Sequence, residues 1–263
     1  MKLDGVSATT LWTLRSRAIE AQRPNPLLDD PWAVRIFNTL EDDDPDRFGR
    51  PLRTHALRAL AFDRVTREHI AGRPATTVVA LGEGLQTSYW RLGKPDVDWL
   101  SVDLPPVIDL REQILPAEPR VRAARMSALD RGWLDLVDPA HDVLISAEGL
   151  FMYLDRAEVL SLIADCARRF PGGRLIYDSI PAWYSKLTLI GLRLSNRYTA
   201  PPMPLSLSVS QSARLVRTIP GVAAVTDVPL PLGRPRWRAR LARRVTDLPL
   251  VRDLRPAITL LHF

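Results

Sequence analysis

Apolar residues follow two different periods along this chain, and the change between them falls near residue 76. Before that point they recur at helical spacing, as on the face shared by Leu11, Leu14 and Ala18. After it, short apolar runs of strand length alternate with segments of helical period. Such alternation is typical of an α/β protein whose parallel sheet is covered by helices on both faces. We therefore predict an α/β fold preceded by a helical N-terminal lid, residues 1–72.

Proline and aspartate mark the helix boundaries within this lid. Pro24 and Pro26 end the first helix, because proline cannot continue it. Asp30 followed by Pro31 is typical of a helix start, with the aspartate as cap and the proline in the first turn. A third helix is predicted over about residues 52–71.

The predicted strands are short β-branched and aliphatic runs. They lie near residues 77–81, 98–103, 120–124, 142–147 and 173–178, with a closing strand at 257–263. The clearest helix covers residues 155–170, where Asp155 and Glu158 form a capping arrangement at its start. Cys166 belongs to the apolar stripe of this helix, so we expect a packed core cysteine rather than a reactive thiol.

Residues 180–215 interrupt the alternation with aromatic residues such as Trp183 and a proline-rich turn. A long stretch between late strands often forms a cap over a substrate, and the alternative is a surface excursion without function. We expect a single domain. Its parts are the lid, a cofactor-binding core at 73–179, this cap insertion, and C-terminal strands at 216–263.

Composition is that of a soluble globular protein. The 263 residues are 46% hydrophobic and 25% charged, and apolar runs are too short to span a membrane. The N-terminus lacks a basic-then-apolar leader. Cys166 is the only cysteine, which excludes an internal disulfide. A cytoplasmic location is therefore expected, and nothing in the sequence indicates the oligomeric state.

The net charge of +6 is concentrated in one place, residues 234–244, which are rich in arginine. This segment is interpreted as a solvated surface, with an alternative as a patch for nucleic acid. An acidic run at 41–46 lacks the ligand spacing of a metal site, so we predict no metal.

Residues 77–104 carry the strongest functional signal. Gly82 and Gly84 follow a buried strand, where glycine permits a tight turn and the close approach of a ligand. Asp103 ends the next strand, about twenty residues later, and is placed to hold the two hydroxyls of a ribose. The chain is therefore predicted to bind a cofactor that contains adenosine.

The loop between these elements favours one cofactor over another. A nicotinamide-binding loop has a third glycine, and here that position is Thr87. Glu83 would repel a diphosphate, whereas an acidic loop suits the positive sulfonium and ammonium of S-adenosylmethionine. We predict S-adenosylmethionine; a dinucleotide, or a glycine turn that binds no cofactor, are the alternatives.

Several motifs in fixed order resemble the leucine carboxyl methyltransferase family, in particular its bacterial branch of polyketide-type O-methyltransferases. They are Arg23-Pro-Asn-Pro-Leu27 with Asp29-Asp30-Pro31, Arg58-Ala-Leu-Ala-Phe62-Asp63, Leu81-Gly-Glu-Gly-Leu-Gln-Thr87, Asp103-Leu-Pro105 and Ala147-Glu-Gly-Leu-Phe-Met-Tyr-Leu154. The resemblance implies a class I methyltransferase fold, a Rossmann-like seven-stranded sheet whose last strand is antiparallel, with a helical N-terminal extension over the cofactor cleft. It also implies methyl transfer from S-adenosylmethionine to a carboxyl or hydroxyl group of a small molecule.

The resemblance also implies roles for individual residues. Arg58 matches the arginine that pairs with the methionine carboxylate of the cofactor, Gly82 the glycine beside its methionine part, and Asp103 the ribose acid. Glu148 matches an acid near the cofactor ammonium and the transfer site. The expected cofactor-binding set is Arg58, Gly82, Glu83, Gly84, Asp103, Leu104, Ser127, Ala128, Leu129 and Glu148. Simpler interpretations are a surface arginine for Arg58 and a helix cap for Asp103.

Two departures from the family pattern affect this set. The family loop has alanine and aspartate where this chain has Glu83 and Gln86. The family also often has an aspartate beside the adenine; here either Ser127 or Asp130 takes that place, and we favour the backbone of 127–129.

The catalytic residues are not identified by sequence. Glu148 and Tyr153 are candidates near the transfer site, and His55 is a weaker candidate for a general base. Two other functions remain open. The basic segment 234–244 allows a nucleic-acid methyltransferase, and the altered loop allows a protein that binds S-adenosylmethionine without catalysis. The identity of the acceptor cannot be predicted.

Overall fold

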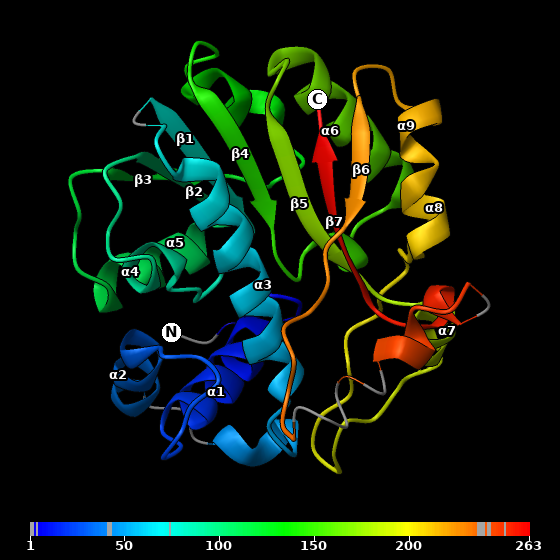
Figure 1. Cartoon of the computed structure of the whole chain (residues 1–263). Helices are drawn as coiled ribbons and strands as arrows, with labels where there is room; N and C mark the ends of the chain where they lie inside the picture. Colours follow the sequence, from blue (N-terminus) through cyan, green and yellow to red (C-terminus); the bar gives the residue numbers. More distant parts are fainter. Residues whose placement is uncertain are drawn as a thin grey trace.

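The protein, seen in a computed structural model, is built on one sheet with the strand order β3-β2-β1-β4-β5-β7-β6 (Figure 1). The structure describes residues 3, 5–40, 44–73, 75–235, 240, 243–249 and 251–263. The strands are β1 (Thr76–Leu81), β2 (Asp98–Asp103), β3 (Val121–Arg125), β4 (Asp142–Ala147), β5 (Arg174–Ser179), β6 (Ala224–Asp227) and β7 (Ala257–His262). Strands β1 to β5 are parallel, and β7 is antiparallel to β5 and β6.

The α-helices lie on both faces of this sheet and at the edge where the parallel strands end (Figure 1). They are α1 (Thr9–Ala21), α2 (Pro31–Thr39), α3 (Arg53–Ile70), α4 (Ser88–Arg91), α5 (Pro105–Ile114), α6 (Arg156–Arg169), α7 (Ala182–Leu189), α8 (Val209–Ala213) and α9 (Leu215–Thr218). Short 3-10 helices are η1 (Pro45–Phe48), η2 (Arg131–Leu136), η3 (Phe151–Tyr153) and η4 (Arg252–Leu254). The predicted α/β fold with a seven-stranded Rossmann-like sheet and an antiparallel last strand is confirmed.

Every predicted strand agrees with the observed one to within one residue at each end. Apolar side chains of β1 are buried on both faces: Val79 joins the core under α6, and Val78 joins the core under α5. A strand buried on both sides has a continuous apolar sequence, which is why its position could be predicted. Strand β6 was not placed individually, since its residues are largely exposed and carry little pattern.

Helix α6 also follows its prediction. It begins after Asp155, whose side chain accepts hydrogen bonds from the backbone N–H groups of Ala157 and Glu158. Cys166 is fully buried in the core, and burial raises the pKa of its thiol to about 12. The cysteine is therefore a packed core residue, as predicted.

The position of the N-terminal helices relative to the sheet could not be predicted from the sequence. In Figure 1, α1 and α2 lie beneath the end of the sheet toward which β4 points, and α3 crosses one face of it. Asp30 caps α2 by accepting from Ala33 N–H at 3.0 Å, as predicted. Whether these helices act as a lid, and whether residues 180–215 act as a cap, stay predictions.

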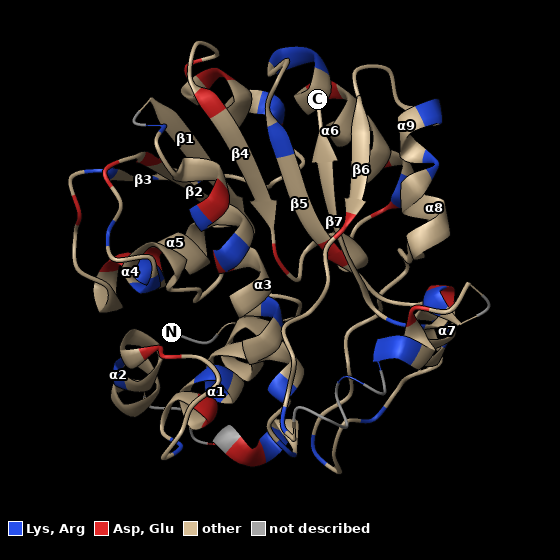
Figure 2. Cartoon of the chain, viewed as in Figure 1, with Lys and Arg blue, Asp and Glu red and all other residues tan. Residues whose placement is uncertain are grey.

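Charged residues are concentrated on helices and loops, and β4 and β5 carry theirs only near their ends (Figure 2). Among the described residues, no helix is long and apolar enough to cross a bilayer. Much of the basic segment 234–244 and of the acidic run 41–46 falls outside the described residues. Expectations for those two segments remain untested.

A buried histidine on α3 makes stability depend on pH. Burial, and then the nearby charge of Arg174, lower the pKa of His69 to about 4, although Asp142 opposes this. The unfolded chain binds a proton at His69 near pH 6.5, whereas the folded chain does not until about pH 4. The free energy of unfolding should therefore fall by up to roughly 3 kcal/mol as the pH drops through that window. Urea denaturation of wild type and His69→Leu between pH 7 and 4.5 measures the effect; equal pH slopes in both would contradict it.

Candidate functional site

The carboxyl ends of β1, β2 and β4 border a cavity of about 210 Å³, which we call the loop cavity. It lies beside the turn after β1, where Gly82 and Gly84 have φ of +57° and +55°. These angles belong to the left-handed region, which favours glycine. A side chain at Gly82 would also collide with Leu150. The turn therefore needs glycine for its conformation, and a larger residue at Gly82 would also require Leu150 to move.

Helix α1 lies directly on this glycine turn. Thr10 Oγ1 accepts a hydrogen bond from Leu85 N–H at 2.6 Å. A Cβ atom added to Gly84 would collide with the same oxygen. Thr9, Thr10 and Thr13 all line the loop cavity, so α1 forms one of its walls. The sequence contained no signal for this contact, because hydroxyl residues on a helix usually face solvent.

Asp103 stands at the end of β2 and borders the loop cavity. Its two carboxylate oxygens accept hydrogen bonds from the backbone N–H groups of Gly84 and Leu104, each at 2.7 Å. Burial raises its pKa, although these two bonds and Arg111 act against the rise. Each carboxylate oxygen has a further lone pair, so Asp103 both fixes the turn and can accept hydrogen bonds from a ligand.

Glu83 faces the protein interior rather than offering its charge to the cavity. Its carboxylate pairs with Arg111 at 2.8 Å and accepts from Trp99 Nε1 at 3.2 Å and from the Ser101 hydroxyl. The argument that its charge suits a cationic cofactor is therefore not supported. The neighbouring departure, Gln86, donates from Nε2 to Glu148 at 2.8 Å. Both unusual loop residues thus have structural partners.

Arg58 on α3 joins two acids that end neighbouring strands. Its Nε donates to Glu148 at 3.0 Å and its Nη1 to Asp178 at 3.0 Å. Nη2 lies against Gly149, where an added Cβ would stand 2.9 Å away, and makes no hydrogen bond to the described residues. Burial acts to lower the pKa of Arg58, but the charges of Asp178 and Glu148 outweigh burial, so the net pKa is raised and the guanidinium is charged. Burial raises the pKa of Glu148.

The turn after β3 provides the remaining wall. Ser127 and Ala128 line the loop cavity, whereas Leu129 packs against the core instead. Asp130 caps η2 by accepting from Gly132 N–H at 2.9 Å. The alternative in which Asp130 replaces Ser127 at the cavity is therefore not favoured.

A second cavity of about 310 Å³, the aromatic cavity, lies next to the first. Apolar and aromatic side chains dominate its lining, including Trp12 of α1 and Trp183 and Tyr184 of α7. Five residues line both cavities and separate them: Thr9, Thr13, Arg58, Gly149 and Tyr153. Two ligands bound side by side would therefore meet at this shared wall.

Two titratable side chains at the aromatic cavity are held neutral. Burial, and then the charges of Arg58 and Arg17, lower the pKa of His55 well below its ordinary value. Burial raises the pKa of Tyr153, although a hydrogen bond with Thr9 acts against the rise. Near neutral pH the site therefore offers an uncharged imidazole and an uncharged phenol.

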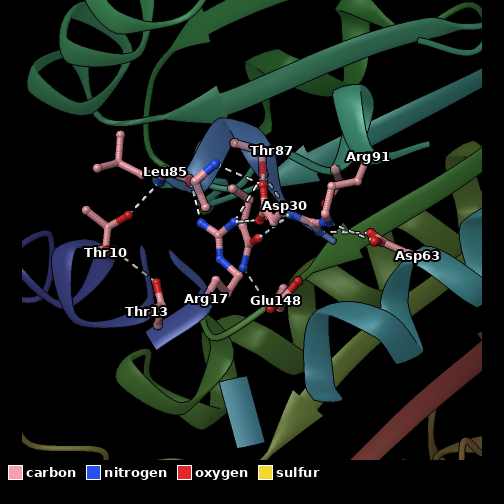
Figure 3. Close-up of polar contacts among 12 residues, drawn as sticks. Thr10, Thr13, Arg17, Asp30, Asp63, Leu85, Thr87, Arg91 and Glu148 are labelled. Atoms are coloured by element: carbon pink, nitrogen blue, oxygen red, sulfur yellow. Dashed lines mark hydrogen bonds and ion pairs between the residues drawn. The ribbon is translucent and has the colours of Figure 1, made fainter. Parts of the chain in front are cut away.

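Beneath the glycine turn lies a buried network of charges that spans four elements (Figure 3). Asp30 pairs with Arg17 and, at 3.0 Å, with Arg91, and it accepts from Thr87 Oγ1 at 2.6 Å. Arg91 also makes two bonds to Asp63, at 2.8 and 2.9 Å. Burial acts to raise the pKa of Asp30, but the charges of Arg17 and Arg91 outweigh burial, so the net pKa of Asp30 is lowered. This network ties α1, α2 and α3 to the loop.

Nine of the ten predicted cofactor-binding residues line the loop cavity. They are Arg58, Gly82, Glu83, Gly84, Asp103, Leu104, Ser127, Ala128 and Glu148. Sequence reasoning missed Thr10, Arg17 and Asp178. Asp178 could have been found, because it lies near the carboxyl end of a parallel strand. Among the described residues, no group of three or more His, Cys, Asp or Glu could hold a metal ion; the absence of a metal stays a prediction.

Known proteins similar in sequence to this chain are methyltransferases. A sequence model of the leucine carboxyl methyltransferase family matches residues 10–167. The tetracenomycin polyketide synthesis O-methyltransferase TcmP of Streptomyces glaucescens is 31% identical over 190 residues, which cover 70% of this chain and 69% of that protein. The S-adenosyl-L-methionine-dependent methyltransferase dpfgK of Gibberella zeae is 30% identical over 187 residues, covering 64% of this chain and 62% of that protein.

Among solved structures, the N-methyltransferase NodS of Bradyrhizobium japonicum has the same fold. Its TM-score is 0.50 at 12% identity, and the match covers 80% of this chain and 98% of that one. At this identity the likeness concerns the fold alone.

Proposed function

This chain belongs to the leucine carboxyl methyltransferase family, and on that premise we propose that it is an O-methyltransferase acting on a small molecule. Family membership, together with relatives described as S-adenosylmethionine-dependent, makes it a methyltransferase that uses S-adenosylmethionine. Our proposal concerns the acceptor, a carboxyl or hydroxyl oxygen of a small molecule, and the residues that bind the cofactor and border the site of methyl transfer. The O-methyltransferase TcmP, the relative cited above, supports an oxygen acceptor.

The loop cavity fits the cofactor by the chemistry of its walls. Gly82 and Gly84 line the cavity, so the backbone of the turn borders the space that a ligand would occupy. Asp103 has lone pairs for two ribose hydroxyls, and Ser127 with Ala128 would border the adenine. When bound, S-adenosylmethionine supplies a methyl group on a positively charged sulfur, and the protein supplies orientation and electrostatics.

Arg58 and Glu148 would hold the amino-acid part of the cofactor. Nη2 of Arg58 is the guanidinium nitrogen that no described residue engages, so it can donate to a carboxylate while Nε and Nη1 stay with Glu148 and Asp178. Glu148 and Asp178 together carry one more negative charge than Arg58 neutralises. This excess suits an ammonium group at the same place.

The observation that carries the proposal is the wall shared by the two cavities. A methyl group presented from the loop cavity would face a ligand in the aromatic cavity across Gly149 and Tyr153. The apolar walls of the aromatic cavity suit an organic molecule with a ring body. Alignment of the acceptor oxygen with the methyl group, and exclusion of water, are the contributions that such a site makes to methyl transfer.

Binding and transfer test the proposal separately. Calorimetry with S-adenosylhomocysteine should show one site per chain. Incubation with ¹³C-methyl S-adenosylmethionine and a panel of phenols and aromatic carboxylic acids should give labelled O-methyl products, detected by mass spectrometry. Label found only in an added oligonucleotide, or only on nitrogen or carbon, would contradict the O-methyltransferase assignment. If S-adenosylhomocysteine did not bind, the assignment of the loop cavity as the cofactor site would be wrong.

A further inference from the structure

Asp178 and Glu148 lie at the ends of two neighbouring parallel strands, and they face different cavities. Glu148 follows β4 and lines the loop cavity but not the aromatic cavity. Asp178, near the end of β5, lines the aromatic cavity but not the loop cavity. Arg58 lines both cavities and pairs with both acids, at 3.0 Å each. These three side chains therefore divide the shared wall into a cofactor side and an acceptor side.

The carboxylate of Asp178 is held in a fixed orientation and still has lone pairs for a ligand. Its Oδ1 accepts a hydrogen bond from Gly149 N–H at 2.5 Å, and its Oδ2 accepts one from Arg58 Nη1 at 3.0 Å. Each carboxylate oxygen has two lone pairs, so each keeps one that these bonds do not use. The side chain is 10% exposed and lines the aromatic cavity. Asp178 is therefore an oriented hydrogen-bond acceptor on the acceptor side.

The charges around the shared wall favour a neutral acceptor. Glu148 and Asp178 carry one more negative charge than Arg58 neutralises. The sulfonium of S-adenosylmethionine would balance this excess, because the ammonium and the carboxylate of the cofactor cancel each other. Among the described residues that line the aromatic cavity, the charged ones are Arg58 and Asp178, which pair with each other. An acceptor carboxylate would therefore stand beside Asp178 without a counter-ion, which is costly in a poorly solvated site.

We propose that Asp178 receives the hydroxyl proton of the acceptor, and that the acceptor is a hydroxyl compound such as a phenol rather than a carboxylate. This inference rests on the proposed function, because it takes the aromatic cavity as the acceptor site. A lone pair of the acceptor oxygen forms the bond to the methyl carbon, and the pair of the old methyl–sulfur bond stays on sulfur, which becomes neutral. The O–H bond breaks, its electron pair stays on the oxygen, and the proton passes to a carboxylate oxygen of Asp178. Asp178 then returns the proton to water.

Binding of 1-naphthol and 1-naphthoate tests the charge preference without turnover. The two compounds share one ring system, and near pH 7 the first is neutral and the second is an anion. Calorimetry on protein saturated with S-adenosylhomocysteine gives the dissociation constant of each. We expect naphthol to bind at least about tenfold more tightly, the size of effect that one hydrogen bond to a charged group produces.

Glu148 offers a matched control, because both acids pair with Arg58 and they differ in the cavity that they line. Asp178→Asn keeps the size of the side chain and removes its charge, so it should reduce the preference for naphthol at least about fivefold. Glu148→Gln removes the same charge from the cofactor side. It should weaken the binding of S-adenosylhomocysteine and change the preference for naphthol by less than about twofold.

The dependence of the rate on pH reports on the proton itself. Asp178→Asn should slow the methylation of a phenol about 100-fold, a loss typical of a missing general base. At higher pH the phenol loses its proton to water, so the rate of this variant should rise with pH more steeply than that of wild type. A nitro-substituted phenol, which ionises more readily, should likewise narrow the gap between the two proteins.

The outcomes separate this inference from the proposed function. Tighter binding of naphthoate by wild type, or equal changes of preference in Asp178→Asn and Glu148→Gln, would overturn the role of Asp178. A rate defect that neither higher pH nor the nitro-phenol reduces would do the same, and would mean that Asp178 only positions Arg58. If Asp178→Asn does not fold, the labelled products of wild type decide: methyl groups on hydroxyl oxygens support the inference, and methyl groups on carboxyl oxygens alone overturn it. Failure of S-adenosylhomocysteine to bind wild type would instead refute the proposed function.

Discussion

Replacing Asp30 by alanine should lower the free energy of unfolding by about 3–5 kcal/mol, the cost of removing one partner of a buried ion pair. Arg17 and Asp30 are both fully buried, and Arg91 is almost so. Without the carboxylate, Arg17 keeps bonds to Leu85 O and Thr87 Oγ1 but loses its only counter-charge among the described ion pairs. An uncompensated buried guanidinium cannot escape by losing its proton, because arginine stays charged in proteins.

The adjacent residue provides the control. Asp29 is exposed, and Asp29→Ala removes the same charge from the sequence without touching the network. Urea denaturation at pH 7 should therefore give a free energy of unfolding that is lowered by about 3–5 kcal/mol in Asp30→Ala and by less than about 0.5 kcal/mol in Asp29→Ala. Similar losses in both variants would mean that the network contributes little to folding.

Asp103→Ala should weaken S-adenosylmethionine binding roughly 100-fold, if two ribose hydroxyls donate to its carboxylate. Hydrogen bonds to a charged group are worth about 1.5–3 kcal/mol each, so two of them at the lower end of this range are worth about 3 kcal/mol, which corresponds to a little over about 100-fold in affinity. Loss of the bond from Gly84 N–H would also loosen the turn. Calorimetry measures the dissociation constant directly, and it does not require a known acceptor.

Asp109 gives a comparison on the next helix. It is a surface residue of α5 that pairs with Arg125, away from the loop cavity. Asp109→Ala should bind the cofactor as wild type does. If Asp103→Ala also kept wild-type affinity, the carboxylate would serve only to fix the turn through Gly84 and Leu104, and the ribose assignment would be wrong.

The sequence alone predicted the sheet and the location of the loop cavity. Buried parallel strands have apolar sequences on both faces, and short strands end where acids or glycines begin, so β1, β2 and β4 and the residues after them could be placed. The positive φ of Gly82 and Gly84 is a local property of the turn, and the presence of glycine in the sequence at these two positions indicates it. Nine predicted residues share one cavity because the ends of parallel strands share one edge.

Only the tertiary structure decided the partners of the side chains. The sequence could not show that the carboxylate of Glu83 pairs with Arg111, 28 positions along the chain. Arg17 reaches the carbonyl of Leu85 across 68 residues, and Trp12 meets His55 and Tyr198 from separate segments. Periodicity reports which face of an element is buried. Which charge or ring lies opposite depends on how distant elements pack, and the buried charge network and the wall shared by the two cavities both arise from that packing.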